Sequence, residues 1–208
     1  MNIVRSVVLA SVVICCLSYR ALAGWVGDSD GGREFTNSFG GFIGYNMLQK
    51  GFTGYTNYAS FGADWYMISD DSLYSVNAED QWKDNIFYRV SFDYFPLVVP
   101  EGNYGASEDM VALSGDALYS IYHNEKVRCF AGMGIGAYLD RISVDTPATG
   151  KLSSQYFYPG LKSSVGAIFR VYEDYEVIPE IRTHWIYTVN NYFTVNTVVQ
   201  VGFARRFK

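Results

Sequence analysis

The C-terminal segment of the chain alternates between two kinds of side chain, and this alternation limits the possible folds more than any other feature. From Phe193 to Phe207, the odd-numbered positions carry mostly bulky apolar side chains, whereas the even-numbered positions carry mostly polar or small ones. Because successive side chains of a β-strand point to opposite faces, the segment predicts a strand with one apolar face. This strand is much longer than the typical length of about 5–6 residues in globular proteins.

The same period of two recurs along the chain. We predict strands at 38–47, 55–66, 86–95, 110–122, 127–139, 161–171, 177–189 and 193–207. Each segment is long enough for the roughly 9–11 residues that a tilted strand needs to cross a membrane. Short polar turns are expected at 123–126, 173–174 and 190–191, and longer polar stretches at 69–84, 98–107 and 141–155. The pattern predicts a single all-β domain of eight antiparallel strands.

Residues 1–23 have the organisation of a secretory signal peptide. Arg5 precedes an apolar run at 7–17, and a small-x-small cleavage site ends at Ala23. This apolar run is shorter than the about 20 residues that a transmembrane helix requires. We therefore expect residues 1–23 to be cleaved and residues 24–208 to form the mature barrel domain.

Alternation alone does not show which face of the strands is polar and hydrated in the fold, the outer face or the inner one, because soluble barrels and membrane barrels have the same alternation. A soluble barrel turns its apolar face inward, whereas a membrane barrel turns that face toward lipid and lines its lumen with polar groups. The charges of the predicted strands distinguish the two. Four acids and four bases fall on the polar face: Asp64, Asp93, Asp116, Glu180, Arg89, Lys162, Arg170 and Arg182.

This balance of charge favours an enclosed lumen, because an unpaired charge in a low dielectric costs several kcal/mol. Loss of the signal peptide with its two arginines changes the net charge from −5 to −7, so the balance belongs to the strands and not to the whole chain. We predict that these eight side chains and His184 form a polar network in the lumen. A soluble exported β-barrel that binds a hydrophobic ligand is an alternative.

Three segments carry a resemblance to a known family: the glycine-rich strand 129–138, the strand 166–170 and the alternating strand that ends near Phe207. Together they make the chain similar to the small bacterial outer-membrane barrels of the OmpA/OmpX type. The resemblance implies an eight-stranded antiparallel up-and-down transmembrane β-barrel in a Gram-negative-type envelope. It also implies membrane lipid as a partner, and a C-terminal aromatic signal that the barrel-assembly machinery reads. Here the signal residues are Phe203 and Phe207.

The family topology further implies which parts of the chain face outward. Both termini and the turns at 123–126 and 173–174 would lie in the periplasm. The loops near 49–53, 98–107, 141–155 and 189–191 would face the outside, where they can meet an extracellular ligand or a host surface. The long polar segment 69–84 then falls on the periplasmic side, where short turns are the rule.

No motif for catalysis, metal binding or a cofactor is found in the chain. Two histidines and the single mature cysteine, Cys129, do not supply a metal site. The glycines at 132, 134 and 136 lie within a predicted strand and not in a phosphate-binding loop. The acidic composition gives no electrostatic footprint for nucleic acid. We therefore expect no enzymatic activity, no cofactor and no nucleic-acid partner.

These observations favour a structural or surface-interaction barrel whose lumen is filled with side chains. The main alternative is a narrow pore for small solutes or ions. Eight strands leave an interior just wide enough for side chains, which disfavours a pore. A lipid-modifying outer-membrane enzyme is a further alternative, and the missing nucleophile–base pair disfavours it.

Overall fold

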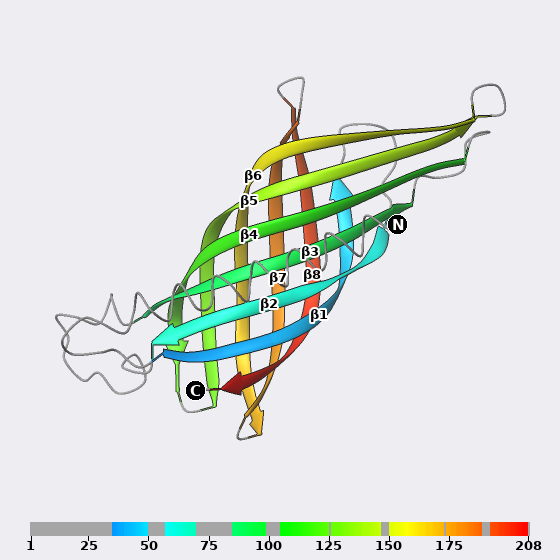
Figure 1. Cartoon of the computed structure of the whole chain (residues 1–208). Helices are drawn as coiled ribbons and strands as arrows, with labels where there is room; N and C mark the ends of the chain where they lie inside the picture. The colour runs from blue at the N-terminus through cyan, green and yellow to red at the C-terminus, as the bar shows by residue number, and fades with distance from the viewer. Residues whose placement is uncertain are drawn as a thin grey trace. The chain divides into compact units, whose positions relative to one another are not determined.

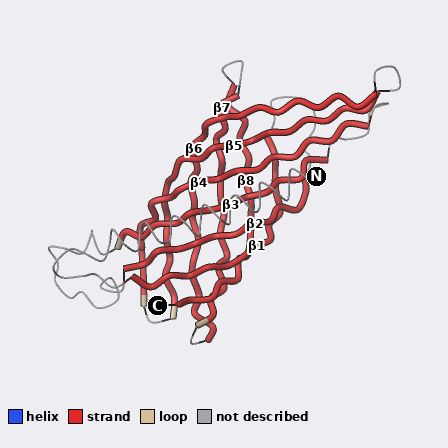
Figure 2. The backbone as a smooth tube through the Cα atoms, viewed as in Figure 1, coloured by secondary structure: helices blue, strands red, loops and turns tan. Residues whose placement is uncertain are grey.

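The computed structural model describes residues 35–49, 57–69, 85–98, 105–124, 126–146, 150–172, 174–188 and 192–207, and nearly all of them are β-strand (Figure 2). The strands are β1 (Phe35–Gln49), β2 (Asn57–Ser69), β3 (Ile86–Val98), β4 (Gly105–His123), β5 (Val127–Thr146), β6 (Gly150–Tyr172), β7 (Tyr175–Thr188) and β8 (Tyr192–Phe207). Each strand pairs antiparallel with the next, and β8 pairs with β1 to close the barrel (Figure 1). The eight predicted strands and their up-and-down order are confirmed.

Several predicted features lie outside the described residues, namely the signal peptide at 1–23, the turn at 190–191 and most of the segments 49–53, 69–84 and 98–107. Within the described ranges, no helix is long and apolar enough to cross a membrane. The short turns predicted at 123–126 and 173–174 connect β4 to β5 and β6 to β7, as expected.

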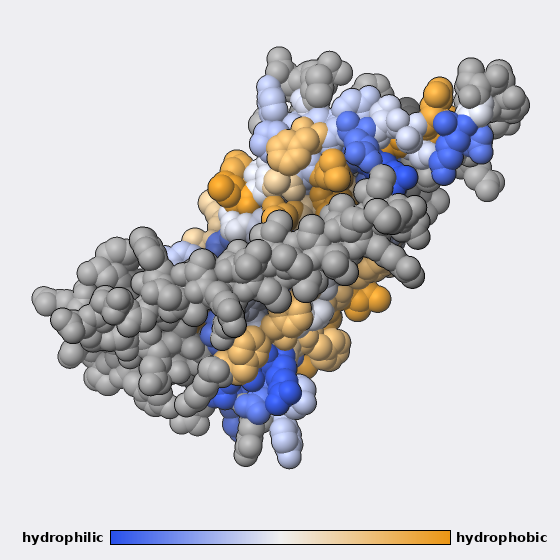
Figure 3. Space-filling view, viewed as in Figure 1, coloured by the Kyte–Doolittle hydropathy of each residue, from blue (hydrophilic) through white to orange (hydrophobic). Residues whose placement is uncertain are grey.

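The apolar face of the alternating strands points outward. Ile43, Ile135 and Phe203 are 62%, 71% and 63% exposed, and Figure 3 shows hydrophobic residues over the middle of the described strands. We call this surface the apolar band. It includes Phe39, Ile43, Tyr45, Phe61, Tyr88, Leu113, Tyr119, Met133, Ile135, Leu161, Val165, Ile181, Val199, Val201 and Phe203. A continuous apolar surface of this kind is typical of the lipid-facing belt of a membrane barrel.

The predicted polar loop at 141–155 is wrong, because most of this segment forms strands. β5 continues to Thr146 and β6 begins at Gly150, and these two residues are partners in the strand register. Gly150 has a φ of 71°, in the left-handed region that favours glycine. The apolar alternation is lost here because residues 150–157 are exposed on both faces.

The prolonged strands project past the end of β7 as a hairpin, which is the yellow-green pair of arrows that reaches furthest to the upper right in Figure 1. Residues 150–159 of β6 pair with β5, whereas the pairing of β6 with β7 starts at Gly160. We call residues 150–159 the β6 extension. Among the described residues, the strand register shows no partner for the outer edge of 151–157, which makes this segment an edge strand.

Candidate functional site

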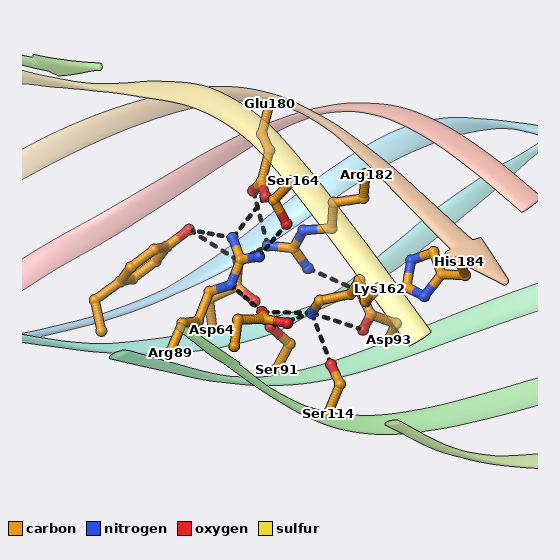
Figure 4. A network of polar contacts seen from close by, with 12 residues as sticks. Asp64, Arg89, Ser91, Asp93, Ser114, Lys162, Ser164, Glu180, Arg182 and His184 are labelled. Carbon is orange, nitrogen blue, oxygen red and sulfur yellow. Dashed lines mark hydrogen bonds and ion pairs between the residues drawn. The ribbon is translucent and has the colours of Figure 1, made fainter. Parts of the chain in front are cut away.

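Seven charged side chains from five strands meet in the middle of the lumen (Figure 4). They are Asp64 on β2, Arg89 and Asp93 on β3, Asp116 on β4, Lys162 on β6, and Glu180 and Arg182 on β7. We call this set the charged layer. None of these side chains is more than 7% exposed. Four carboxylates face three cations, so the layer is close to electrically neutral.

Arg89 spans the lumen and joins β3 to four other strands. Its Nε donates to Asp116 Oδ2 at 2.7 Å, and its Nη1 donates to Glu180 Oε1 at 2.6 Å. Its Nη2 donates to Ser164 Oγ at 2.6 Å. The Tyr66 hydroxyl accepts a further bond from Nη1 at 3.3 Å. The guanidinium fork thus makes charge-assisted hydrogen bonds in fixed directions, which are stronger than neutral ones.

Arg182 forms the second centre of the charged layer. Its Nη1 donates to Asp93 Oδ1 at 2.8 Å, and its Nη2 donates to Glu180 Oε2 at 2.9 Å. The same Nη2 atom also pairs with the carboxylate of Asp64. The guanidinium carbon lies 4.6 Å from the centre of the Phe42 ring, which adds a cation–π contact. Glu180 therefore bridges the two arginines.

Lys162 completes the charged layer on the wall formed by β5 and β6. Its Nζ lies 2.8 Å from Asp116 Oδ2 and donates to Ser114 Oγ at 2.7 Å and to Ser91 Oγ at 2.9 Å. Gly134 lies between Asp116 and Lys162 in the strand register. A Cβ atom at Gly134 would overlap the Asp116 carboxylate. Glycine at this position therefore makes room for the ion pair.

Two apolar clusters enclose the charged layer from both ends of the lumen. The turn-end cluster, near the β4–β5 and β6–β7 turns, contains Tyr66, Ile68, Phe87, Leu118, Phe130, Ile168, Ile178 and Ala204. The loop-end cluster contains Phe95, Met110, Ala112, Tyr138, Tyr158, Ile186 and Val198. On β7, Ile178 precedes Glu180 and Arg182, and Ile186 follows them. The order along the lumen is therefore apolar, charged, apolar.

The sequence analysis missed these inward apolar side chains, because it sorted residues to the two faces partly by their type. Strict alternation would have found them. Counting by twos from Asp116 places Leu118 in the lumen, and counting from Arg182 places Ile178 and Ile186 there. The alternation of the strands, applied without regard to residue type, was therefore the signal that could have located these residues.

No known sequence family and no curated protein matches this chain. Solved structures do match it. Neisserial surface protein A is 14% identical, with a TM-score of 0.62 over 84% of this chain and 100% of that one. The fold is that of a small transmembrane β-barrel. Ail of Yersinia pestis matches this barrel at 13% identity and a TM-score of 0.55, over 84% of this chain and 99% of its own.

A major outer membrane protein from Thermus thermophilus has the same barrel fold at 12% identity, with a TM-score of 0.51 over 82% of this chain and 99% of that one. Ail has also been solved in complex with the heparin analogue sucrose octasulfate, and that structure matches with a TM-score of 0.58 at 13% identity, over 84% of this chain and 99% of its own. The likeness agrees with the OmpA/OmpX-type barrel that the sequence pattern resembles.

The two other residues of the predicted lumen network, His184 and Arg170, are not among the seven ion-paired side chains of the charged layer. His184 lies next to the layer (Figure 4), opposite Lys162 in the strand register, and is fully buried beside the loop-end cluster. Its Nδ1 lies 2.9 Å from the hydroxyl of Tyr138, and the edge of its ring meets the Phe95 ring at 5.2 Å between centroids. Arg170 lies near the turn between β6 and β7, opposite Glu176. The contacts of the described residues do not join Arg170 to the charged layer.

Phe203 and Phe207 lie on the outer face of the barrel on β8 and are 63% and 40% exposed. Their role as an assembly signal stays a prediction. Within the described part of the chain, no group of three or more His, Cys, Asp or Glu side chains is placed to hold a metal ion.

Proposed function

We propose that this chain is an exported integral protein of a bacterial outer membrane, with a structural or surface-interaction role and a side-chain-filled lumen. The observation that carries the proposal is the charged layer enclosed between two apolar clusters. Lipid contacts the apolar band, and the barrel-assembly machinery reads Phe203 and Phe207. Fractionation tests the location: the protein should stay in the membrane fraction until detergent is added, and the mature chain should begin at Gly24. A fraction that is soluble after export without detergent contradicts the proposal.

A conducting pore is the second candidate, and the contents of the lumen argue against it. The side chains of Arg89, Lys162 and Arg182 lie across the lumen and are 0% exposed. The interior of an eight-stranded barrel is only wide enough for such side chains. In planar bilayers we expect no steady conductance above the baseline. Large, discrete single-channel steps would support the pore and contradict a filled lumen.

An enzymatic role has less support. Hydrolytic chemistry needs a nucleophile and a base within hydrogen-bond reach of each other and open to substrate. His184 is buried, its Nδ1 atom is engaged by the Tyr138 hydroxyl, and aromatic rings surround it. This environment suits a packed lumen residue, and we propose no catalytic activity for the barrel.

The β6 extension is the surface that best suits an interaction role. Its outer edge is long, and Lys151 is its single charged residue. Exposed edges of this kind pair with extended segments of other chains, because backbone hydrogen bonds supply the affinity. Leu152 is 58% exposed and offers a side-chain contact beside the edge. The resemblance to outer-membrane barrels supports an outward-facing hairpin, which would meet a matrix or host component.

The charges of the projecting strands indicate the kind of partner. Ail has been solved with a sulfated heparin analogue, and a polyanion of this type requires a cationic surface. In this chain, residues 105–110, 139–146 and 150–159 carry four acids and two bases, but Glu108 and Asp140 are buried. The charges left at the surface are Asp109, Asp145, Arg141 and Lys151, two of each sign. This balance favours a neutral polypeptide over a polyanion.

Shortening the hairpin tests the interaction role. Residues 142–145 pair with residues 151–154 in register, so deleting both groups removes an even number of paired positions and keeps the faces of the remaining strands. We expect cells that display this variant to lose adhesion to immobilised matrix or host-surface components that wild-type cells bind. The matched control is Gln155→Ala, which keeps the edge intact. Equal adhesion by the shortened variant contradicts the proposal.

A further inference from the structure

The outer wall of the barrel contains a hollow of about 850 Å³ that crosses β3 to β7. Its floor includes the small outward residues Gly115, Ala137 and Pro159. Bulky side chains surround this floor, among them Ile135 and Phe157, which are 71% and 69% exposed. The hollow therefore lies within the apolar band and is separate from the lumen.

The strand register explains why the hollow lies at this place. Leu113, Ala137 and Pro159 are direct neighbours across β4, β5 and β6, and Gly115 lies opposite Ile135. A Cβ atom at Gly115 would meet no other atom within 4 Å. Neither backbone conformation nor internal packing therefore requires a glycine at this position. The absence of a side chain at Gly115 makes the hollow in the outer wall deeper.

We propose that this hollow binds one acyl chain of a phosphate-bearing membrane lipid. The lining consists almost entirely of hydrocarbon, and it includes the outward residues Val90, Leu161 and Trp185. Proteins that associate within a bilayer rely on close packing of small residues together with polar contacts. This surface offers few polar groups to a protein partner, whereas an acyl chain needs only dispersion contacts along its length.

A cationic side chain lies where the headgroup of such a lipid would sit. Arg141 is on the same outward face of β5 as Ala137 and four residues further along, roughly 13 Å at the usual strand rise. Asp109 lies opposite Arg141 in the register. Arg141 can pair with a phosphate through two parallel hydrogen bonds. The hollow and Arg141 thus match the chain and the headgroup of one lipid.

Native mass spectrometry tests the proposal with phosphatidylglycerol as the probe. The barrel is reconstituted in phosphatidylglycerol nanodiscs, transferred to detergent, and measured for the fraction that retains one lipid. Gly115→Leu places a side chain in the hollow at a position where a Cβ atom meets nothing within 4 Å, and we expect it to lower this fraction by about tenfold through lost dispersion contacts. The matched control is Ala117→Leu, which adds a leucine to the same face of β4 outside the hollow. Arg141→Gln should lower retention by about threefold.

Lipid retention by the variants decides whether the hollow is a lipid site. A loss with Gly115→Leu but not with Ala117→Leu supports the lipid site. Equal retention by both variants, or an equal loss in both, overturns it. No effect of Arg141→Gln overturns the assignment of the headgroup. A disulfide-linked dimer formed in membranes by Gly115→Cys, in a Cys129→Ala background, identifies a second copy of the chain as the occupant and also overturns the proposal.

Discussion

Replacing Arg182 by alanine tests the energetic basis of the closed lumen. The guanidinium pairs with the carboxylates of Asp64, Asp93 and Glu180, and all of these groups are buried. The change removes one positive charge and leaves buried carboxylates without their main partner. Breaking a buried ion pair from one side typically costs about 3–5 kcal/mol. We expect Arg182→Ala to lower the free energy of unfolding by this amount.

The assay is urea unfolding of the barrel in lipid vesicles, followed by tryptophan fluorescence. Arg205→Ala is a matched control, because Arg205 is an exposed residue of β8 outside the charged layer, and surface changes are usually within about 0.5 kcal/mol. A second variant, Arg182→Ala with Asp64→Asn, should recover part of the loss, because an amide no longer carries a buried charge. The slope of the transition should stay constant across these variants.

An unchanged unfolding midpoint for Arg182→Ala would refute the reasoning, because it would mean that water reaches the layer and screens its charges. A destabilisation that Asp64→Asn does not relieve would point to lost packing against Phe42 in place of orphaned charge. The two variants therefore separate electrostatic support from simple loss of volume.

Four further predictions concern the closed barrel and its glycines. The folded protein should migrate differently before and after heating in detergent gels, and identical migration would contradict a stable closed barrel. Gly134→Val should destabilise the barrel by about 1–3 kcal/mol, because its side chain overlaps the Asp116 carboxylate. Gly115→Val, on the open outer face, should leave the urea midpoint unchanged. Gly150→Val should cost about 1–3 kcal/mol, because a β-branched residue is strained at a φ of 71°, and Gly150→Asn should cost less.

The strands were predictable because successive side chains of a barrel strand point alternately outward and into the lumen. This alternation appears in the sequence as a period of two. This period locates β8 and the positions of Asp116 and Arg182 without any knowledge of the pairing. It fails in the β6 extension, because residues 150–157 are exposed on both faces and no longer alternate there. The alternation therefore predicted the strands only as far as the apolar band extends.

The details of the lumen were less predictable than its charge balance. Leu118 and Ile186 are the same types of residue that face lipid elsewhere, so composition could not assign them to the interior. Arg170 shares the inward face of β6 with Lys162, but it lies near the turn that leads to β7. The depth of a residue along the barrel depends on the shear between strands. The alternation in the sequence gives the face on which a residue lies, but it contains no information about the shear and therefore none about the depth.

The charged layer also has a consequence for how the barrel is assembled. The contacts of Arg182 with Asp64 and with Asp93 join residues that are 118 and 89 positions apart in the chain, and the contact of Arg89 with Glu180 spans 91 positions. An incomplete sheet inserted into lipid would hold unpaired arginines and carboxylates in hydrocarbon. Arg89 and Lys162 can pair with Asp116 before β7 arrives, but Asp64 and Asp93 gain Arg182 only when β7 comes opposite β2 and β3. The interior charges therefore make half-built barrels unstable and favour closure as a single, late event.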